Sequence, residues 1–384
     1  MASLVRSENA PNFWRVIGWL SLLIPFLALS YYGVIAAWAL DYLGLAVING
    51  FDGFDATRSE IVYGQRTGRA ITQVVLHGIF VAMTVWVIAK GLHNGIERMS
   101  KIMLPALFGV ILILVIYGMI SADFSSAVEF LFRPDFSKLN GASVLMALGQ
   151  ALFSLGIGVG LLITYAAYMP SEYSIQKSAT IVCVFDTSAA LLSGLAIFPL
   201  VFANNLNPAE GPGLVFQTLP IAFGNMPGGH GIGVLFFLLL FFAAYTTAIG
   251  MLEPVVAWLE EKWPGRRRIV ARWAGISIWL LGLGSVFSFN IFAEVSPLGF
   301  LGIEGTFFFL LDFAVANLLL PINALLIAVF AGWVLNRSTI TQEFSSRTEL
   351  WPQFWRFANR YVAPIAISIV LLDLLTGFSA NFSV

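Results

Sequence analysis

Cysteine, histidine and charge are all scarce in this chain of 384 residues. Its one cysteine, Cys183, excludes a disulfide framework and a cysteine-based metal cluster. Charged residues make up 11% and hydrophobic residues 59% of the sequence, whereas an average soluble domain has roughly 25% charged residues. The net charge of −1 lacks the basic surplus of a nucleic-acid-binding protein, and the hydrophobicity excludes a disordered chain. The composition therefore predicts a protein that lies in a lipid bilayer.

Nine stretches are long and apolar enough to cross a hydrocarbon core about 30 Å thick, for which a helix needs about 20 residues. They are 14–42, 68–90, 102–121, 143–168, 178–203, 231–259, 271–288, 306–334 and 358–378. The first is too long for a cleavable signal peptide. No internal repeat and no soluble domain is visible, so residues 1–384 are expected to form a single, all-α membrane domain.

The positions of Lys and Arg predict the orientation, because these residues collect on the cytoplasmic side. If the N-terminus is cytoplasmic, fifteen of the 20 basic residues lie in inner segments and five in outer ones. Nine spans then place the C-terminus on the outer side. The cluster Arg266–Arg268 is interpreted as an anchor of this topology. The apolar centre of the outer loop, Leu214–Phe223, is expected to fold back over the membrane surface.

Acidic residues within three spans are candidates for function, because a charge inside a membrane is costly. The position of Asp186, inside its span, favours coordination of a cation or proton. Glu253 precedes Pro254 near the cytoplasmic end, where access to solvent favours a structural role. Asp312 lies near the outer end of its span, and position alone leaves a gate ion pair and simple solvation open. The three histidines do not lie at catalytic or metal-ligand spacing from Cys, Asp or Glu, so no enzyme is predicted.

Glycine interrupts the span 143–168 at three alternate positions, 156, 158 and 160. Each glycine costs a helix about 1 kcal/mol relative to alanine. Alternate glycines can permit close helix packing, but three of them beside Gln150 and Ser154 favour a broken helix whose freed backbone groups line a cavity.

Two neighbouring hydroxyls, those of Thr246 and Thr247, lie in the span 231–259. They either bond back to carbonyl groups of their own helix or supply oxygen ligands to a cation. Transporters built from inverted repeats usually contain a second broken helix facing the first, and none is visible in this sequence.

Five stretches resemble bacterial members of the neurotransmitter:sodium symporter family, in the family's order. They read Trp14-Arg15-Val16-Ile17-Gly18-Trp19-Leu20, Ser30-Tyr31-Tyr32, Gly95-Ile96-Glu97-Arg98, Gly149-Gln150-Ala151-Leu152-Phe153-Ser154-Leu155 and Leu240-Phe241-Phe242-Ala243-Ala244-Tyr245-Thr246-Thr247. The resemblance implies the five-plus-five inverted-repeat fold. It aligns the nine spans with helices three to eleven of the family, so the domain is expected to lack the first two helices, and with them the second broken helix.

The resemblance also implies roles for single residues. In the substrate site, Tyr32 matches the residue that binds the substrate carboxylate, and Phe153 matches the aromatic lid. The side chain of the substrate is expected to face Ala28, Gly156, Val159, Leu162 and Met251. Thr247 is also expected to contact the substrate. Ser154 and Asp186 match ligands of the first sodium site, and Ala243, Thr246 and Thr247 match those of the second. Gln150, Phe153 and Asp312 match the outer gate.

The implied function is sodium-coupled symport of an amino acid or related small amine by alternating access, across the inner (plasma) membrane of a bacterium. Small and medium-sized residues in the pocket leave room for a bulky apolar or aromatic substrate. A carboxylate at Asp186 lies near the place where animal members bind chloride, which predicts transport without chloride.

One alternative is a truncated, non-transporting membrane fragment or subunit, because the first helix of the family supplies part of each site. A channel, or a transporter of another family with a related fold, is a third interpretation. The sequence predicts no particular oligomer.

Overall fold

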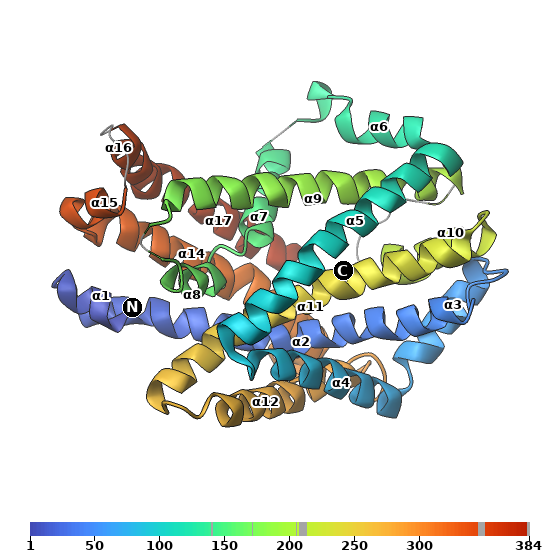
Figure 1. Ribbon diagram of the computed structural model, residues 1–384, viewed down its shortest axis with the longest axis horizontal. Coiled ribbons are helices and arrows are strands. Elements are labelled where there is room, and N and C mark those ends of the chain that lie inside the picture. The colour runs from blue at the N-terminus through green and yellow to red at the C-terminus, as the bar shows by residue number, and fades with distance from the viewer. Residues whose placement is uncertain (140, 171, 205, 207–212, 345–349, 382–384) are drawn as a thin grey trace.

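The computed structural model describes residues 1–139, 141–170, 172–204, 206, 213–344 and 350–381, and all regular structure in these ranges is helical. Figure 1 labels the α-helices; short 3-10 and π segments are designated η. In chain order the elements are α1 (Ala2–Ser7), η1 (Asn12–Arg15), α2 (Val16–Val47), α3 (Ala56–Thr67), α4 (Ala70–Ile88), η2 (Leu92–Glu97), α5 (Arg98–Ser121), α6 (Phe124–Phe132), η3 (Phe136–Lys138), α7 (Gly141–Ser154), α8 (Leu161–Ala167), α9 (Ile175–Ala203), η4 (Leu214–Thr218), α10 (Leu219–Asn225), α11 (Gly229–Lys262), α12 (Arg267–Phe287), η5 (Gly299–Leu301), α13 (Phe307–Asp312), η6 (Phe313–Leu319), α14 (Leu320–Val329), η7 (Phe330–Val334), α15 (Arg337–Glu343), α16 (Leu350–Phe357), η8 (Ala358–Val362) and α17 (Ala363–Asn381).

Seven helices among the described residues are long and apolar enough to cross a membrane. They are Asn12–Val47, Ala70–Ile88, Leu92–Ser121, Ile175–Ala203, Gly229–Lys262, Arg267–Phe287 and Phe307–Val334. Each contains most or all of one predicted span. Of the other two predicted spans, 143–168 is divided between α7 and α8, and 358–378 falls on η8 and α17. The structure therefore supports seven spans directly and does not confirm the count of nine.

The segments predicted to share a side of the membrane lie at the same end of the molecule. In Figure 1, α1, α15 and α16 lie at the left end, and α3 and α10 lie at the right end. The sequence places the first group on the inner side and the second on the outer side. The structure thus agrees with the predicted alternation of loops, while the assignment of one end to the cytoplasm stays a prediction.

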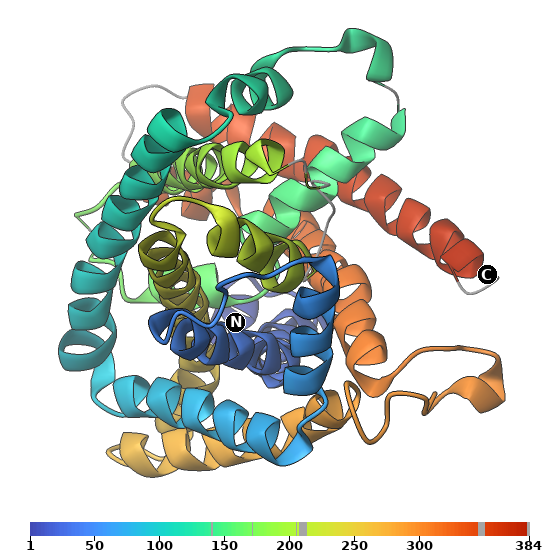
Figure 2. The same ribbon diagram turned by 90° about the vertical axis from the view of Figure 1, so that its right-hand side faces the viewer.

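Helices α2 and α11 pack against each other at the centre of the molecule, and the end-on view of Figure 2 shows the other helices around them. In the most apolar stretch of each helix, 61% of the α2 span and 56% of α11 are buried, but only 6% of α9. A helix that is apolar on all sides is expected in the core or in lipid. α2 and α11 therefore form the core, and α9 lies at the periphery.

The outer loop contributes two short helices to this core. η4 and α10 contain the apolar centre predicted from the sequence, and Phe216, Leu219 and Phe223 are buried there. The Ser59 hydroxyl of α3 donates to the Gln217 carbonyl oxygen at 2.7 Å. The described part of this loop is thus packed into the protein at the end where α3 lies.

Candidate functional site

The backbone leaves the helical path between α7 and α8 at the three alternate glycines. Gly156, Gly158 and Gly160 have φ angles of +63°, +93° and +92°, a left-handed region that glycine adopts without strain. A Cβ atom at Gly160 would lie 2.2 Å from the carbonyl oxygen of Ser21 on α2, and one at Gly158 would lie 2.5 Å from that of Leu320 on α14. Glycine is required for the turn and for the close approach, and the predicted break is confirmed.

A buried asparagine of α14, Asn323, holds the broken segment in place. Its side-chain amide donates to the Gly158 carbonyl oxygen at 2.7 Å and to the Ser21 hydroxyl at 3.1 Å. Asn323 is fully buried, and its Oδ1 has no hydrogen-bond partner in the described part of the protein. Asn323 was not among the predicted site residues, which were charged residues and members of the Gly- and Thr-rich segments. A polar amide in an apolar span was the available signal.

The last residue of α7 meets α9 at an acidic side chain. The Ser154 hydroxyl lies 2.8 Å from each carboxylate oxygen of Asp186. One hydroxyl carries one proton, so the pair retains several oxygen lone pairs for another partner. Oxygen ligands with a negative charge suit a hard cation, and broken helices of transporters are places where such ions bind. The structure thus brings together the two residues predicted as ligands of the first sodium site.

The threonine pair of α11 donates to carbonyl groups of its own helix. Thr246 Oγ1 lies 3.0 Å from the carbonyl oxygens of Phe242 and Ala243, and Thr247 Oγ1 lies 3.0 Å from that of Ala243. These are the bonds usual for threonine in an apolar helix. They use the hydroxyl protons and leave the oxygen lone pairs, so the geometry fits both interpretations of the pair. The Ala243 carbonyl, the third predicted ligand, already accepts both bonds.

Two adjacent tyrosines of α2 contact two different predicted residues. The hydroxyl of Tyr32 lies near that of Thr247, so the predicted carboxylate-binding residue lies beside the predicted second sodium site. The hydroxyl of Tyr31 likewise lies near the Asp312 carboxylate. Asp312, at the end of α13, is half-buried, which differs from simple solvation. Its contact with Tyr31 was not predicted from the sequence.

Three of the predicted substrate contacts share one apolar cluster next to the break. Ala28 of α2 and Val159 of the broken segment are buried in this cluster, and Met251 of α11 packs against it. These residues are 131 and 92 positions apart in sequence. The fold therefore gathers this part of the predicted pocket lining, and the gathered surface is apolar.

The remaining predicted pocket and gate residues are more open. Phe153 is 59% and Leu162 44% exposed, Gln150 is exposed on α7, and Gly156 is half-buried. An aromatic lid over a bound molecule is expected to be largely covered. In this structure Phe153 is not buried with the apolar cluster.

The C-terminal half of α11 carries a buried ion pair, which fits the structural role predicted for Glu253 and corrects only its predicted access to solvent. The side chain of Glu253 is completely buried and pairs with Arg267 of α12. Tyr168 donates a hydrogen bond to Glu253 Oε1 at 2.7 Å. Arg267 also binds Glu260 Oε2 and the Ile88 carbonyl oxygen, each at 2.8 Å. Glu253 is thus not accessible to solvent, and Arg267 does more than anchor the topology.

Neither histidine residues nor clusters of metal-binding side chains contribute to the candidate transport site in the described part of the chain. Among the described residues, no group of three or more His, Cys, Asp and Glu side chains could hold a metal ion. His93 Nδ1 lies 2.8 Å from Glu97 Oε2, four residues away, which corrects the prediction that no histidine is spaced to pair with an acidic residue. Because the two side chains are 84% and 42% exposed, this pair belongs to the surface.

Comparison with known proteins identifies the family. A family model described as the sodium:neurotransmitter symporter family matches residues 65–382. The chain belongs to this family. An uncharacterised sodium-dependent transporter of Bacillus subtilis, YhdH, is 33% identical over 96% of this chain and 82% of its own length. An uncharacterised sodium-dependent transporter of Haemophilus influenzae is 30% identical over 97% of this chain and 81% of its own length.

A solved structure is similar over most of the fold. The crystal structure of MhsT in complex with L-phenylalanine has a TM-score of 0.83 and 34% sequence identity, and the match covers 94% of this chain and 81% of MhsT. These findings confirm the predicted family and an all-helical transporter fold, and they support sodium-coupled transport by an integral membrane protein. They do not confirm that the first two helices of the family are missing.

Proposed function

We propose that this symporter couples the entry of sodium to the uptake of an amino acid with an apolar or aromatic side chain, by alternating access across a bacterial plasma membrane. The contact between Ser154 and Asp186 carries this proposal. It presents negatively charged oxygen ligands at the point where a membrane helix unwinds, which is the arrangement that ion-coupled transporters use. Each sodium ion that enters along a membrane potential contributes about 2.3 kcal/mol per 100 mV.

A second sodium ion is proposed at the threonine pair of α11. The contact between Tyr32 and Thr247 supports it, because a substrate carboxylate bound at Tyr32 would then lie close to a cation bound at Thr247. Attraction between the two charges would make the binding of each favour the other. The sites would act by binding and release alone, without covalent chemistry.

The apolar cluster of Ala28, Val159 and Met251 supports the proposed substrate class. These side chains offer contact area and no charge, so they favour an apolar side chain on the substrate. MhsT was crystallised in complex with L-phenylalanine, which makes this amino acid the first substrate to test. Chloride independence is part of the proposal, because the Asp186 carboxylate supplies a fixed negative charge at the site.

Several finer assignments belong to the same proposal. They are the alignment of the spans with helices three to eleven, the five-plus-five inverted repeat, the cytoplasmic N-terminus and the outer C-terminus. The alternative of a truncated, non-transporting fragment is not supported by the comparisons, since the matches cover nearly the whole chain.

Uptake of labelled L-phenylalanine into proteoliposomes that contain the 384-residue chain tests the proposal. We expect uptake driven by an inward sodium gradient, and the same uptake when gluconate replaces chloride. Asp186→Asn should raise the sodium concentration for half-maximal uptake by about tenfold, as expected for the loss of one charged ligand. Asp123→Asn is a matched control, because this aspartate caps the exposed start of α6.

Three outcomes would contradict the proposal or one part of it. Absence of sodium-driven uptake of every amino acid tested would favour the non-transporting alternative. Equal sodium dependence of the wild type and Asp186→Asn would remove the role assigned to the contact between Ser154 and Asp186. Loss of uptake in gluconate would contradict chloride independence alone.

A further inference from the structure

A basic cavity lies near the C-terminus, between the segments α15, α16 and η8. Its volume is about 750 Å³, and the described residues that line it include Arg337, Arg356 and Arg360 and no carboxylate. Thr341 and Gln353 add a hydroxyl and an amide group. None of the predicted sodium, substrate or gate residues lines this cavity. Three guanidinium groups around one cavity in a chain of net charge −1 indicate a binding site for an anion.

Two of these arginines have buried donors that lack an acceptor. The Nε–H groups of Arg356 and Arg360 are buried, and neither finds a hydrogen-bond partner within the described structure. Buried N–H groups nearly always have an acceptor. A guanidinium presents its donors in a planar fork that fits the oxygen atoms of a phosphate. A phosphate group in this cavity would supply the missing acceptors.

Aromatic stacking and a close backbone contact fix the position of Arg360. Its guanidinium carbon lies 4.0 Å from the centre of the Trp333 ring and 5.6 Å from that of Tyr361, and Trp333 Nε1 donates to the Arg360 carbonyl oxygen at 3.0 Å. A Cβ atom on Gly332 would lie 2.7 Å from the Cα of Arg360. Stacking covers the faces of a guanidinium and leaves the N–H donors on its edge for a ligand.

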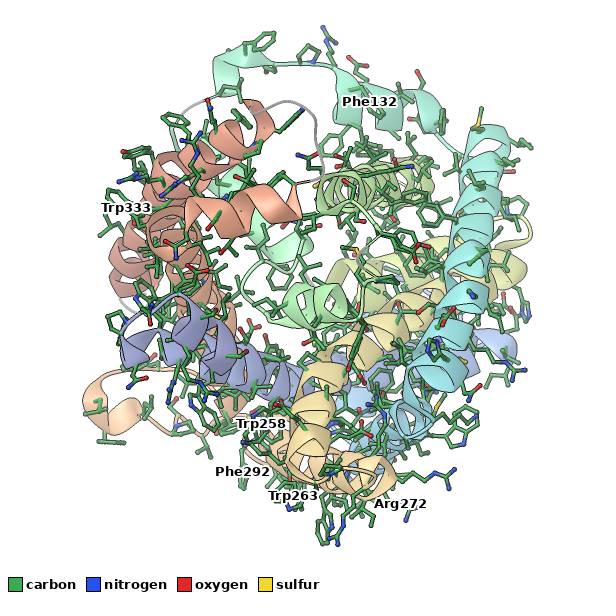
Figure 3. The ribbon with its side chains drawn as sticks, turned by 60° about the vertical axis from the view of Figure 1, so that its left-hand side comes forward. Phe132, Trp258, Trp263, Arg272, Phe292 and Trp333 are labelled. Atoms are coloured by element: carbon green, nitrogen blue, oxygen red, sulfur yellow. The ribbon has the colours of Figure 1, made fainter. Side chains whose placement is uncertain are left out.

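Exposed aromatic side chains flank the cavity. On α16, Trp351, Phe354 and Phe357 are 56%, 63% and 55% exposed, and their spacing of three residues places them along one side of the helix. Trp333 is 51% exposed and lies at the outer edge of the C-terminal helices in Figure 3. Aromatic rings of membrane proteins gather at the level of the lipid headgroups. The cavity therefore has a basic interior and a rim suited to a membrane interface.

We propose that this cavity binds the phosphate group of an anionic phospholipid, whose acyl chains lie against the aromatic side of α16. The basic residues of the chain predict that this end faces the cytoplasm. The cytoplasmic leaflet carries anionic lipids and attracts basic segments. A soluble phosphate has the same headgroup chemistry, but it has no acyl chains that could contact the aromatic side chains at the rim of the cavity.

Native mass spectrometry of the full chain, released from nanodiscs of phosphatidylglycerol and phosphatidylcholine, tests this proposal. We expect the wild type to retain phosphatidylglycerol in preference to phosphatidylcholine. The double variant Arg356→Gln/Arg360→Gln should lose about tenfold in affinity for phosphatidylglycerol, because two charged donors are removed. Arg272→Gln is the matched control, since Arg272 is an exposed arginine of α12, away from the C-terminal helices in Figure 3. This control should change the affinity by less than about twofold.

Arg360→Lys distinguishes the contribution of the planar guanidinium donors from that of the positive charge, because lysine keeps the charge without the planar donors. We expect it to fall between the wild type and Arg360→Gln, and it keeps the proposal testable if the double variant fails to fold. Inorganic phosphate at millimolar concentration should not displace phosphatidylglycerol. Displacement by phosphate would assign the cavity to a soluble anion and overturn the lipid assignment. Unchanged lipid retention in both Arg360 variants would overturn the site itself.

Discussion

Hydroxyl groups at Thr246 and Thr247 use their protons on carbonyl groups of α11, so each oxygen offers lone pairs and no donor toward the interior of the protein. A cation can bind to these oxygens without any rotation of the hydroxyl groups, because both hydroxyl protons already point at carbonyl groups of the helix. An anion would find no hydrogen bond there. The same internal bonds would exist, however, if the threonines did nothing more than stabilise their helix. A substitution that keeps the shape and removes the oxygen can separate the two roles.

Thr247→Val is expected to raise the sodium concentration for half-maximal uptake by about tenfold, the effect of one lost ligand worth about 1.4 kcal/mol. Sodium titration of L-phenylalanine uptake in proteoliposomes measures it. Thr180→Val provides the control, because Thr180 makes the same bond to a carbonyl of its own helix at 3.0 Å but lies on the exposed side of α9. If both variants keep wild-type sodium dependence, the pair has a structural role only.

Contacts of single residues with partners far away in the chain are not determined by a single sequence. Asp186 was a candidate because a carboxylate inside an apolar span is costly, and the resemblance to the family assigned Ser154 and Asp186 to one sodium site. Asn323 and Tyr31 were missed, although each contacts a residue that had been named. The partners in these contacts, Gly158 and Asp312, lie 165 and 281 positions away. Contacts at such distances depend on how whole helices pack, and a local pattern does not contain that information.

At the scale of the element, the break between α7 and α8 depends on glycines that differ from the other glycines of the chain. Gly158 and Gly160 combine a left-handed backbone with contacts that leave no room for a side chain. Gly109, within α5, has open space around it. Equal substitutions at these positions should therefore have opposite effects on stability.

Gly160→Ala is expected to destabilise the protein by roughly 1–3 kcal/mol from backbone strain alone, and by more if Ser21 cannot move. Gly109→Ala should be neutral or stabilise α5 by up to about 1 kcal/mol, since alanine favours the helix. Thermal unfolding of the purified variants in detergent measures the difference. A Gly160→Ala protein as stable as Gly109→Ala would show that the break is not required for the fold.

The helices themselves were the easiest elements to predict. A long apolar stretch in lipid must be helical over its whole length, because its backbone groups can form hydrogen bonds only within the segment. The extent of the helix can therefore be predicted from the extent of the apolar stretch. The seven helices of the described residues that are long and apolar enough to cross a membrane accordingly coincide with predicted spans. The count of nine was not confirmed, because the broken segment and the last stretch are not among these seven helices. Whether a stretch crosses alone or with partners depends on tertiary packing.

For the whole molecule, the buried contact between Glu253 and Arg267 joins α11 to α12, while Tyr168 joins the segment after α8 to the same carboxylate. Arg267→Met leaves this carboxylate buried without an opposite charge, and we expect a loss of about 3–5 kcal/mol in stability. The double variant Glu253→Gln/Arg267→Met should recover much of that loss, because no buried charge remains. Apparent unfolding temperatures in detergent report both effects.

The exposed pair Arg133 and Glu129 gives the matched comparison on the surface. Their side chains are 74% and 57% exposed, so Arg133→Met should cost less than about 1 kcal/mol. Similar losses for Arg267→Met and Arg133→Met would argue against a structural role for the buried pair.

The orientation of the whole chain can be tested with its single cysteine removed. In a Cys183→Ser background, a cysteine introduced by Ser338→Cys, at the start of α15, should react with a membrane-impermeant maleimide only after the cytoplasmic face is opened. A cysteine introduced by Ser125→Cys, at the start of α6, should react in intact cells. Both serines are exposed, so reactivity reports the side of the membrane. The reverse pattern would invert the predicted topology.

The length of the two halves of the broken helix restricts how water can reach it. α7 has 14 residues and α8 has seven, which at 1.5 Å per residue gives about 21 Å and about 10 Å, and neither crosses a 30 Å hydrocarbon core alone. Non-helical peptides at such depth must be buried in protein or line a wet cavity. Gly158 and Gly160 are sealed against α14 and α2, whereas a Cβ on Gly156 would meet no atom closer than 4.0 Å. Water, and any solute that follows it, is therefore expected to enter the break from the Ser154 side.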